Sequence, residues 1–214
     1  MEQKWINLNK LHIILIQMKN SVFKIKLNEY TNTGFLCKIP FPDKNNSLKV
    51  MITFTNLSKE ELKKFNEIHI SFDNKIIHEI YIDEKTKIYA NKVYNISIIE
   101  IRKKNKLDDS LFIEIDESIF NDNQNKLKGM EVYSIGYPYH KEGAYSKGII
   151  KDIKEDGYTI EHLCPSYKGF EGSPIIKIDN MKVIGVHIGE EKNKHHNIGI
   201  FLKKPIEEFN ELFK

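Results

Sequence analysis

Gly169-Phe170-Glu171-Gly172-Ser173-Pro174 is the most informative stretch of the chain. It lies between two strand-like apolar runs, and a Gly-x-x-Gly-x-Pro segment in that setting predicts a tight turn. Glycine permits backbone angles that other residues avoid, and Pro174 opens the next strand, where its missing N–H does least harm. Such a turn presents backbone amides to its surroundings.

Short strand-like runs fill the chain on both sides of this turn. From Ser21 onward, runs of apolar or alternating residues are separated by Asn, Asp, Pro and Lys. Many strands at short spacing, with little helical periodicity between them, indicate barrels or sandwiches rather than βαβ units. The expected strands cover residues 21–27, 33–39, 48–54, 67–72, 75–82, 86–89, 93–101, 111–115, 130–137, 145–153, 158–162, 173–178, 181–188 and 197–202.

Two helices and one linker complete the expected organisation. Ser58 and Glu61 have capping-box spacing, which predicts a helix of one or two turns. Pro205 begins a final helix over residues 206–213, whose apolar residues fall on one face. The polar segment 121–129 is interpreted as a linker. The predicted units are an N-terminal extension (1–20), a first β-barrel half (21–120), the linker (121–129), a second β-barrel half (130–204) and a C-terminal helix (205–214).

Composition fits a globular protein and narrows the function classes. The 214 residues are 40% hydrophobic and 29% charged, and a net charge of +3 gives no support for nucleic-acid binding. The basic cluster at 102–106 is interpreted as a solvated loop in preference to a phosphate site. No run reaches the roughly 18 apolar residues of a membrane helix, and no signal-peptide cleavage pattern follows residues 11–16. We therefore expect a cytoplasmic protein with no membrane partner, in which Cys37 and Cys164 are buried, reduced thiols.

The turn resembles the nucleophile loop of the trypsin/chymotrypsin-like serine peptidases, which reads Gly-x-Ser-Gly-(Gly/Ser)-Pro. Further stretches resemble the same family, and the resemblance covers nearly the whole chain from about Ser21. It implies an all-β fold of two six-stranded-type β-barrels with a C-terminal helix. The matching stretches are Thr33-Gly34-Phe35 near the start, the cleft-wall strand 183–189, the next cleft strand 197–200 and the closing helix.

The three positions that carry catalysis in that family hold other residues here. Glu171 stands at the place of the serine nucleophile, Asn56 at that of the base histidine and Asn95 at that of the orienting aspartate. A carboxylate cannot act as the hydroxyl nucleophile, and an amide cannot accept its proton. We therefore expect no catalytic residues, and Ser173 as a displaced nucleophile is disfavoured. The oxyanion loop at Gly169 and Glu171 is expected to keep its shape, with the Glu171 carboxylate curling back onto its amides.

The cleft strand supplies the candidate binding residues, namely His187, Ile188 and Gly189. For His187 a binding role and a packing role remain equally open, as do an open and a filled cleft. His195 and His196 lie on a charged loop and are interpreted as solvated, so no metal and no cofactor are expected. The preferred function is a catalytically inactive module that binds an extended peptide or protein. The alternatives are an active serine endopeptidase with a non-standard catalytic set and a structural scaffold that uses the outer barrel surface; the sequence leaves the oligomeric state open.

Overall fold

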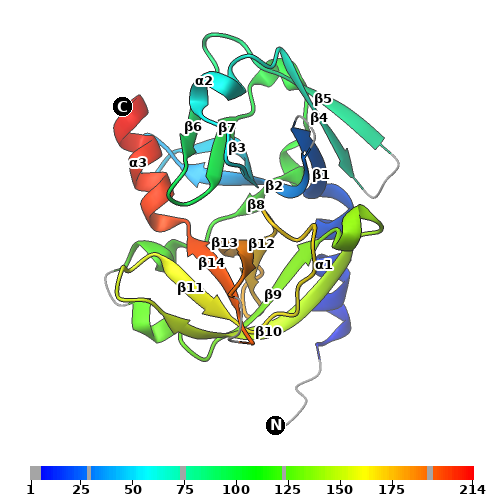
Figure 1. Cartoon of the computed structure of the whole chain (residues 1–214), viewed down its shortest axis with the longest axis vertical. Coiled ribbons are helices and arrows are strands. Elements are labelled where there is room, and N and C mark those ends of the chain that lie inside the picture. Colours follow the sequence, from blue (N-terminus) through cyan, green and yellow to red (C-terminus); the bar gives the residue numbers. More distant parts are fainter. Residues whose placement is uncertain (1–5, 28–29, 73–75, 122–123, 192–194) are drawn as a thin grey trace.

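A computed structural model of the chain describes residues 6–27, 30–72, 76–121, 124–191 and 195–214. Figure 1 shows two β-rich halves, one above the other, with helix α3 against the upper half and helix α1 beside the lower one. The described residues form three α-helices, α1 (Leu8–Asn20), α2 (Lys59–Leu62) and α3 (Lys203–Phe213). Across the described ranges, every helix is too short or too polar to span a lipid bilayer.

The first half is one sheet in the order β5-β4-β1-β2-β3-β7-β6, with β8 added in parallel to β2. All seven strands of this order contribute side chains to one apolar cluster, so the sheet curls around its own core. Among the described residues, no pairing joins the end strands β5 and β6. The strands are β1 (Val22–Leu27), β2 (Tyr30–Pro40), β3 (Ser47–Phe54), β4 (Glu67–Phe72), β5 (Ile76–Tyr81), β6 (Ile88–Asn91), β7 (Ile96–Glu100) and β8 (Ile113–Glu114).

The second half is a closed six-stranded barrel in the order β10-β11-β14-β13-β12-β9. Its strands alternate or run apolar because most positions of β9, β12 and β13 face buried surroundings. The predicted all-β fold with a C-terminal helix is confirmed, although only this half closes its ring of strands. The strands are β9 (Glu131–Gly136), β10 (Ala144–Ile153), β11 (Thr159–His162), β12 (Pro174–Lys177), β13 (Val183–Glu190) and β14 (Asn197–Phe201).

Buried contacts join the two halves. One apolar cluster runs from Ile14 through both halves to Phe209. The ammonium of Lys177 in the second half pairs with Asp116 of the first half at 2.8 Å, and both side chains are more than nine-tenths buried. Three neighbours hydrogen-bond to the carboxylate of Glu208 in α3, namely Tyr89, Asn91 and Tyr94. Helix α3 is thereby attached to the end of the first half that carries Asn95.

The local sequence signals differ in how well they locate the elements. The capping box at Ser58 and Glu61 forms as predicted, with both reciprocal hydrogen bonds present. The strand expected from residue 93 begins only at Ile96, because Asn95 adopts a left-handed conformation (φ 53°) that closes the preceding turn. The expected N-terminal extension contains helix α1, which is capped by Asn7 and buries Ile14 and Gln17.

Candidate functional site

The turn at 169–174 has the shape that its glycines predict. Gly169 and Gly172 have φ of +101° and +91°, in the left-handed region. A Cβ on Gly172 would lie 2.0 Å from the carbonyl oxygen of Thr33, and one on Gly169 would lie 2.3 Å from that of Tyr137. Backbone approaches this close leave no room for any side chain. The turn is therefore fixed against the first half through Thr33 and against its own barrel through Tyr137.

Hydrogen bonds within and around the turn fix the direction of its amides. Phe170 N–H donates to Tyr167, and Ser173 N–H donates back to Phe170. Gly172 N–H donates to the carbonyl of His187 on β13, and His187 N–H donates to Ser173, both at 2.8 Å. Two amides remain outside this frame, those of Gly169 and Glu171.

Glu171 uses its side chain to bind one of these two amides. Its Oε2 accepts the N–H of Gly169 at 2.7 Å, one of the amides that the sequence predicted this carboxylate would bind. Its backbone carbonyl accepts Thr33 N–H at 3.0 Å, and Thr33 Oγ1 donates to Gly169 O at 2.6 Å. The N–H of Glu171 itself donates to no acceptor in the described part of the chain. The turn thus holds one carboxylate oxygen and offers one further donor.

Asn56 and Asn95 reach the same junction from the first half. Asn56 follows β3 and is exposed, whereas Asn95 precedes β7 and is half-buried. Thr55 N–H donates to the carbonyl of Asn95 at 2.9 Å, which brings the two asparagines onto neighbouring backbone segments. Gly172 packs close to the backbone of Phe54, two residues before Asn56. The backbone thus gathers all three positions, but no hydrogen bond among the described residues links the side chains of Asn56, Asn95 and Glu171.

His187 lies inside the barrel and contacts another histidine. Its side chain packs against His162, with Nδ1 of His187 3.1 Å from Nε2 of His162 and the rings in an edge-to-face arrangement. Cys164 N–H donates to Nδ1 of His162, so we assign the His162 proton to Nε2, where it donates to His187. Burial lowers the pKa of His162 to about 4 and holds the pKa of His187 well below its usual range. Both rings are therefore neutral at neutral pH.

Ile188 and Gly189 lie where β13 leaves its neighbour β12. The last contacts between β13 and the β12 side are those of His187, whereas β14 accompanies β13 to Glu190. Beyond His187, no described residue pairs with β13 on the β12 side. Gly189 has φ of +149°, and a Cβ there would meet no described atom within 4 Å. As far as the described residues go, this end of β13 is therefore an open backbone edge with free space beside Gly189.

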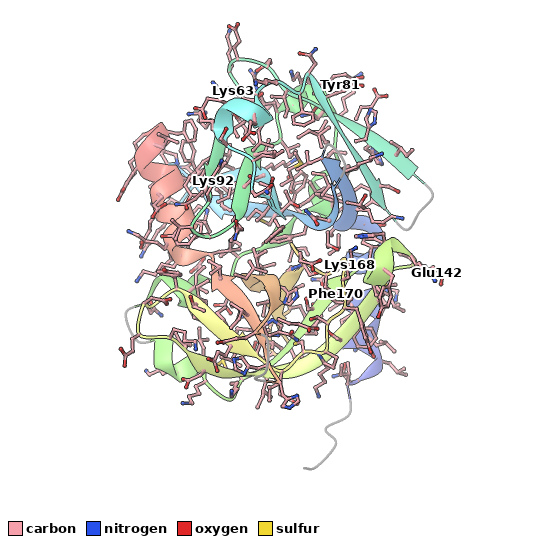
Figure 2. All side chains as sticks on the ribbon, in the orientation of Figure 1. Lys63, Tyr81, Lys92, Glu142, Lys168 and Phe170 are labelled. Carbon is pink, nitrogen blue, oxygen red and sulfur yellow. The ribbon has the colours of Figure 1, made fainter. Side chains whose placement is uncertain are left out.

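A hollow of about 980 Å³ adjoins the turn at Phe170. Tyr139, Tyr145 and Tyr167 line it and expose 58%, 42% and 56% of their surface, which is unusual for three clustered aromatic residues. The buried Phe170 of the turn forms part of its wall. The sequence reasoning missed this hollow, and its only local signals are the tyrosines that follow Pro138 and Pro165. In Figure 2, Lys168 and Phe170 lie near the boundary between the halves, and Glu142 lies farther out.

His196 is buried rather than solvated, in a cluster with two carboxylates. Its Nε2 lies 3.1 Å from Glu191 and 3.3 Å from Glu161, close enough for the three to share a cation. The ammonium of Lys151 lies 3.0 Å from Nδ1 and donates there, so Nε2 carries the proton and faces the carboxylates. Histidines that bind metals show the opposite arrangement, in which the second nitrogen donates. Together with the ion pairs from Lys154 to both carboxylates, this geometry favours a buried ion network over a metal site.

Ser173 and the two cysteines have the environments of packed residues. Ser173 is fully buried, and its Oγ has no partner among the described residues, so it is not accessible to a substrate. Cys37 and Cys164 are buried and free, as predicted. Burial raises the pKa of both thiols, that of Cys164 to about 12.

Solved structures of serine endoproteases share this fold. The chain superposes on the crystal structure of the serine endoprotease from Yersinia pestis with a TM-score of 0.63 and 14% identity, covering 98% of this chain and 68% of that one. It superposes on a serine-to-alanine mutant of Rv3671c from M. tuberculosis H37Rv in its inactive form with a TM-score of 0.65 and 15% identity, covering 98% of this chain and 94% of that one. A second structure, of the Rv3671c protease in its inactive form, gives a TM-score of 0.63 and 14% identity, with 94% of this chain and 93% of that one covered.

These likenesses establish the class of fold. The chain has the two-barrel fold of the chymotrypsin-like serine proteases, as the resemblance of its turn implied. No protein-family model and no curated protein matches its sequence. At 14–15% identity the shared architecture does not carry the neighbours' activity to this chain.

Proposed function

We propose that this chain is a serine-peptidase-fold protein that does not hydrolyse peptide bonds and instead binds an extended peptide or protein segment. The observation that carries the proposal is the hydrogen bond from Gly169 N–H to the carboxylate of Glu171. In acyl transfer, backbone amides at such a turn must be free to stabilise the oxyanion. Here a negatively charged side chain occupies one of them, at the position where the nucleophile is expected.

The partners of a nucleophile are missing in the same place. Asn56 and Asn95 lie on adjacent backbone segments at the junction, and neither side chain can act as a base. Loss of nucleophile and base together removes on the order of a millionfold in rate. An active endopeptidase with a non-standard set would need another accessible serine beside a histidine. Ser173 is buried, and the nearby His187 and His162 rings contact each other.

The open edge of β13 supports peptide binding. An extended peptide adds to a sheet edge through its backbone and gains specificity from pockets beside alternate side chains. Residues 188–190 offer such an edge, and the space beside Gly189 admits a side chain. His187, which lies in the interior, would then support the edge without touching the peptide.

Two measurements test the proposal. We expect no covalent labelling by a serine-directed fluorophosphonate and no cleavage of a mixed peptide library above background. Labelling of a serine near the junction would favour the active endopeptidase.

For binding, the same library is screened against wild type, Gly189→Trp and Gly189→Ala. Both variants strain the positive φ at this position, but only tryptophan fills the space, so only tryptophan should abolish binding. A partner that binds all three proteins equally would favour the scaffold that uses the outer barrel surface.

A further inference from the structure

We infer that the turn at 169–171 is a carboxylate-binding site whose external ligand is the free C-terminus of a peptide, with Glu171 as an internal competitor for the same amides. The inference rests on the proposed function, since it names the kind of peptide that the junction would take. Its basis is the juxtaposition, at one rigid turn, of a bound carboxylate with an amide and a lysine that have no partner among the described residues.

The turn already binds a carboxylate. Glu171 Oε2 lies 2.7 Å from the Gly169 nitrogen, a length typical of a charge-assisted hydrogen bond. The adjacent N–H of Glu171 has no acceptor among the described residues. Because a C-terminal carboxylate has two oxygens, it can accept both amides at once, as carboxylates do in backbone nests. The side chain of Glu171 accepts only one.

The site is rigid, whereas a single hydrogen bond holds the side chain that now occupies it. Thr33 bonds to the carbonyls of both Gly169 and Glu171, and the backbone packs against Thr33 and Tyr137 without space for a Cβ. A ligand therefore meets donors that need no rearrangement. The Glu171 side chain is partly exposed, and Gly169 is its only hydrogen-bond partner in the described chain. Its rotation into solvent would leave both amides free.

Charge selects a carboxylate over an internal peptide carbonyl. A neutral carbonyl that displaced Glu171 would exchange a charge-assisted hydrogen bond for a neutral one, which is roughly half as strong. An incoming carboxylate exchanges one charge-assisted hydrogen bond for another and gains a second hydrogen bond, from the N–H of Glu171. The exposed ammonium of Lys168, next to Gly169, forms no ion pair within the described residues, and Figure 2 shows it near the boundary between the halves. It supplies the positive charge that an arriving C-terminus needs.

The amide site can be tested without any peptide. The backbone amide signals of residues 169 and 171 are followed by NMR during titration with sodium acetate, in wild type, Glu171→Ala and Glu142→Ala. Glu142 is exposed on a nearby loop, and its variant removes the same charge without touching the turn. We expect saturable shifts of both amides, with acetate binding at least about tenfold tighter in Glu171→Ala and unchanged in Glu142→Ala. Absence of acetate-dependent shifts in Glu171→Ala overturns the inference, whatever peptides do.

The peptide arm separates the inference from the proposed function. Peptides selected by the wild-type protein are compared as free acids, as carboxamides and as carboxamides with a terminal glutamate. A preference of about tenfold or more for the free acid, increased by Glu171→Ala and reduced by Lys168→Ala, is the expected result. If wild type binds all three peptide forms equally and Gly189→Trp abolishes that binding, the inference is overturned and the proposed function stands. Preference for the carboxamide with a terminal glutamate overturns the inference, because it assigns the site to acidic side chains. If acetate binds but no peptide does, both proposals are contradicted.

The test does not depend on one variant. If Glu171→Ala does not fold, Glu171→Gln keeps the side-chain length and removes the charge. Its neutral oxygen competes less well with acetate, so acetate binding should again be tighter than in wild type. Acetate affinity equal to that of wild type would then count against the competitor role of Glu171.

Discussion

Lowering the pH should destabilise the folded protein through the buried pair of His162 and His187. Both rings are buried and neutral in the folded state, where burial lowers the pKa of His162 to about 4. In the unfolded chain a histidine has a pKa of about 6.5. Between these values the unfolded state binds more protons than the folded state. Stability is therefore fully present above about pH 6.5 and declines as the pH falls towards about 4.

The magnitude follows from the two pKa values of His162. Linkage gives a loss of about 2 kcal/mol of unfolding free energy between about pH 7.5 and about pH 5 from this residue alone. The pKa of His187 is lowered in the same direction and adds to the loss. For a domain of ordinary stability, a few kcal/mol is a large fraction of the total.

Urea unfolding at both pH values, followed by circular dichroism, measures the effect. The comparison uses wild type, His162→Gln and His12→Gln, where His12 is exposed on α1. Every variant retains the other titrating groups, so differences in pH dependence isolate one ring. We expect His162→Gln to lose about 2 kcal/mol less than wild type on acidification, and His12→Gln to behave as wild type. Equal pH dependence in wild type and His162→Gln would refute the reasoning.

Three further predictions concern the turn, helix α3 and the thiols. Gly172→Ala should lower the free energy of unfolding by about 3 kcal/mol or more. Gly129→Ala is the control, because Gly129 has a positive φ but open space around it, and should lower the free energy of unfolding by about 1–2 kcal/mol. Equal losses in urea unfolding would show that the overlap with Thr33 is relieved. Glu208→Ala should cost about 2–4 kcal/mol, because three donors lose their acceptor, whereas a melting temperature like that of wild type would mean that water replaces the carboxylate. Cys37 and Cys164 should resist alkylation in the native state and react in urea; rapid labelling of either native thiol would contradict its burial.

The sequence was most informative where backbone geometry dictates residue type. Gly172 predicted a left-handed turn, and the Thr33 carbonyl explains why only glycine fits there. The strands followed from their apolar patterns, because core positions recur at fixed spacing in a barrel. Helix α1 was missed because its apolar residues cluster within 11–16, interrupted only by His12, and do not form a helical stripe. Its position depends on distant contacts, such as those of Gln17 with Tyr133 and Met181.

The site contained elements that no local pattern specifies. The contact of His187 with His162 joins residues 25 positions apart on different strands. The exposed tyrosines at 139, 145 and 167 gather only once β10 and the turn are folded together. By contrast, the contact of Glu171 with Gly169 spans two residues and could be predicted. Contacts between residues close in the sequence can be predicted from it, whereas contacts across the barrel depend on strand register.

The unequal closure of the two halves bears on how the junction moves. A closed barrel has no end strand to fray, whereas β5 and β6 each lack a neighbour among the described strands on one side. Amide protons of β5 and β6 should therefore exchange with deuterium before those of the barrel. Glu171 and Gly169 belong to the barrel, but Asn95 directly precedes β7, which pairs with β6. The junction thus lies between a closed barrel, which carries Gly169 and Glu171, and an open sheet, which carries Asn95, and we expect backbone motion to be larger on the side of the open sheet.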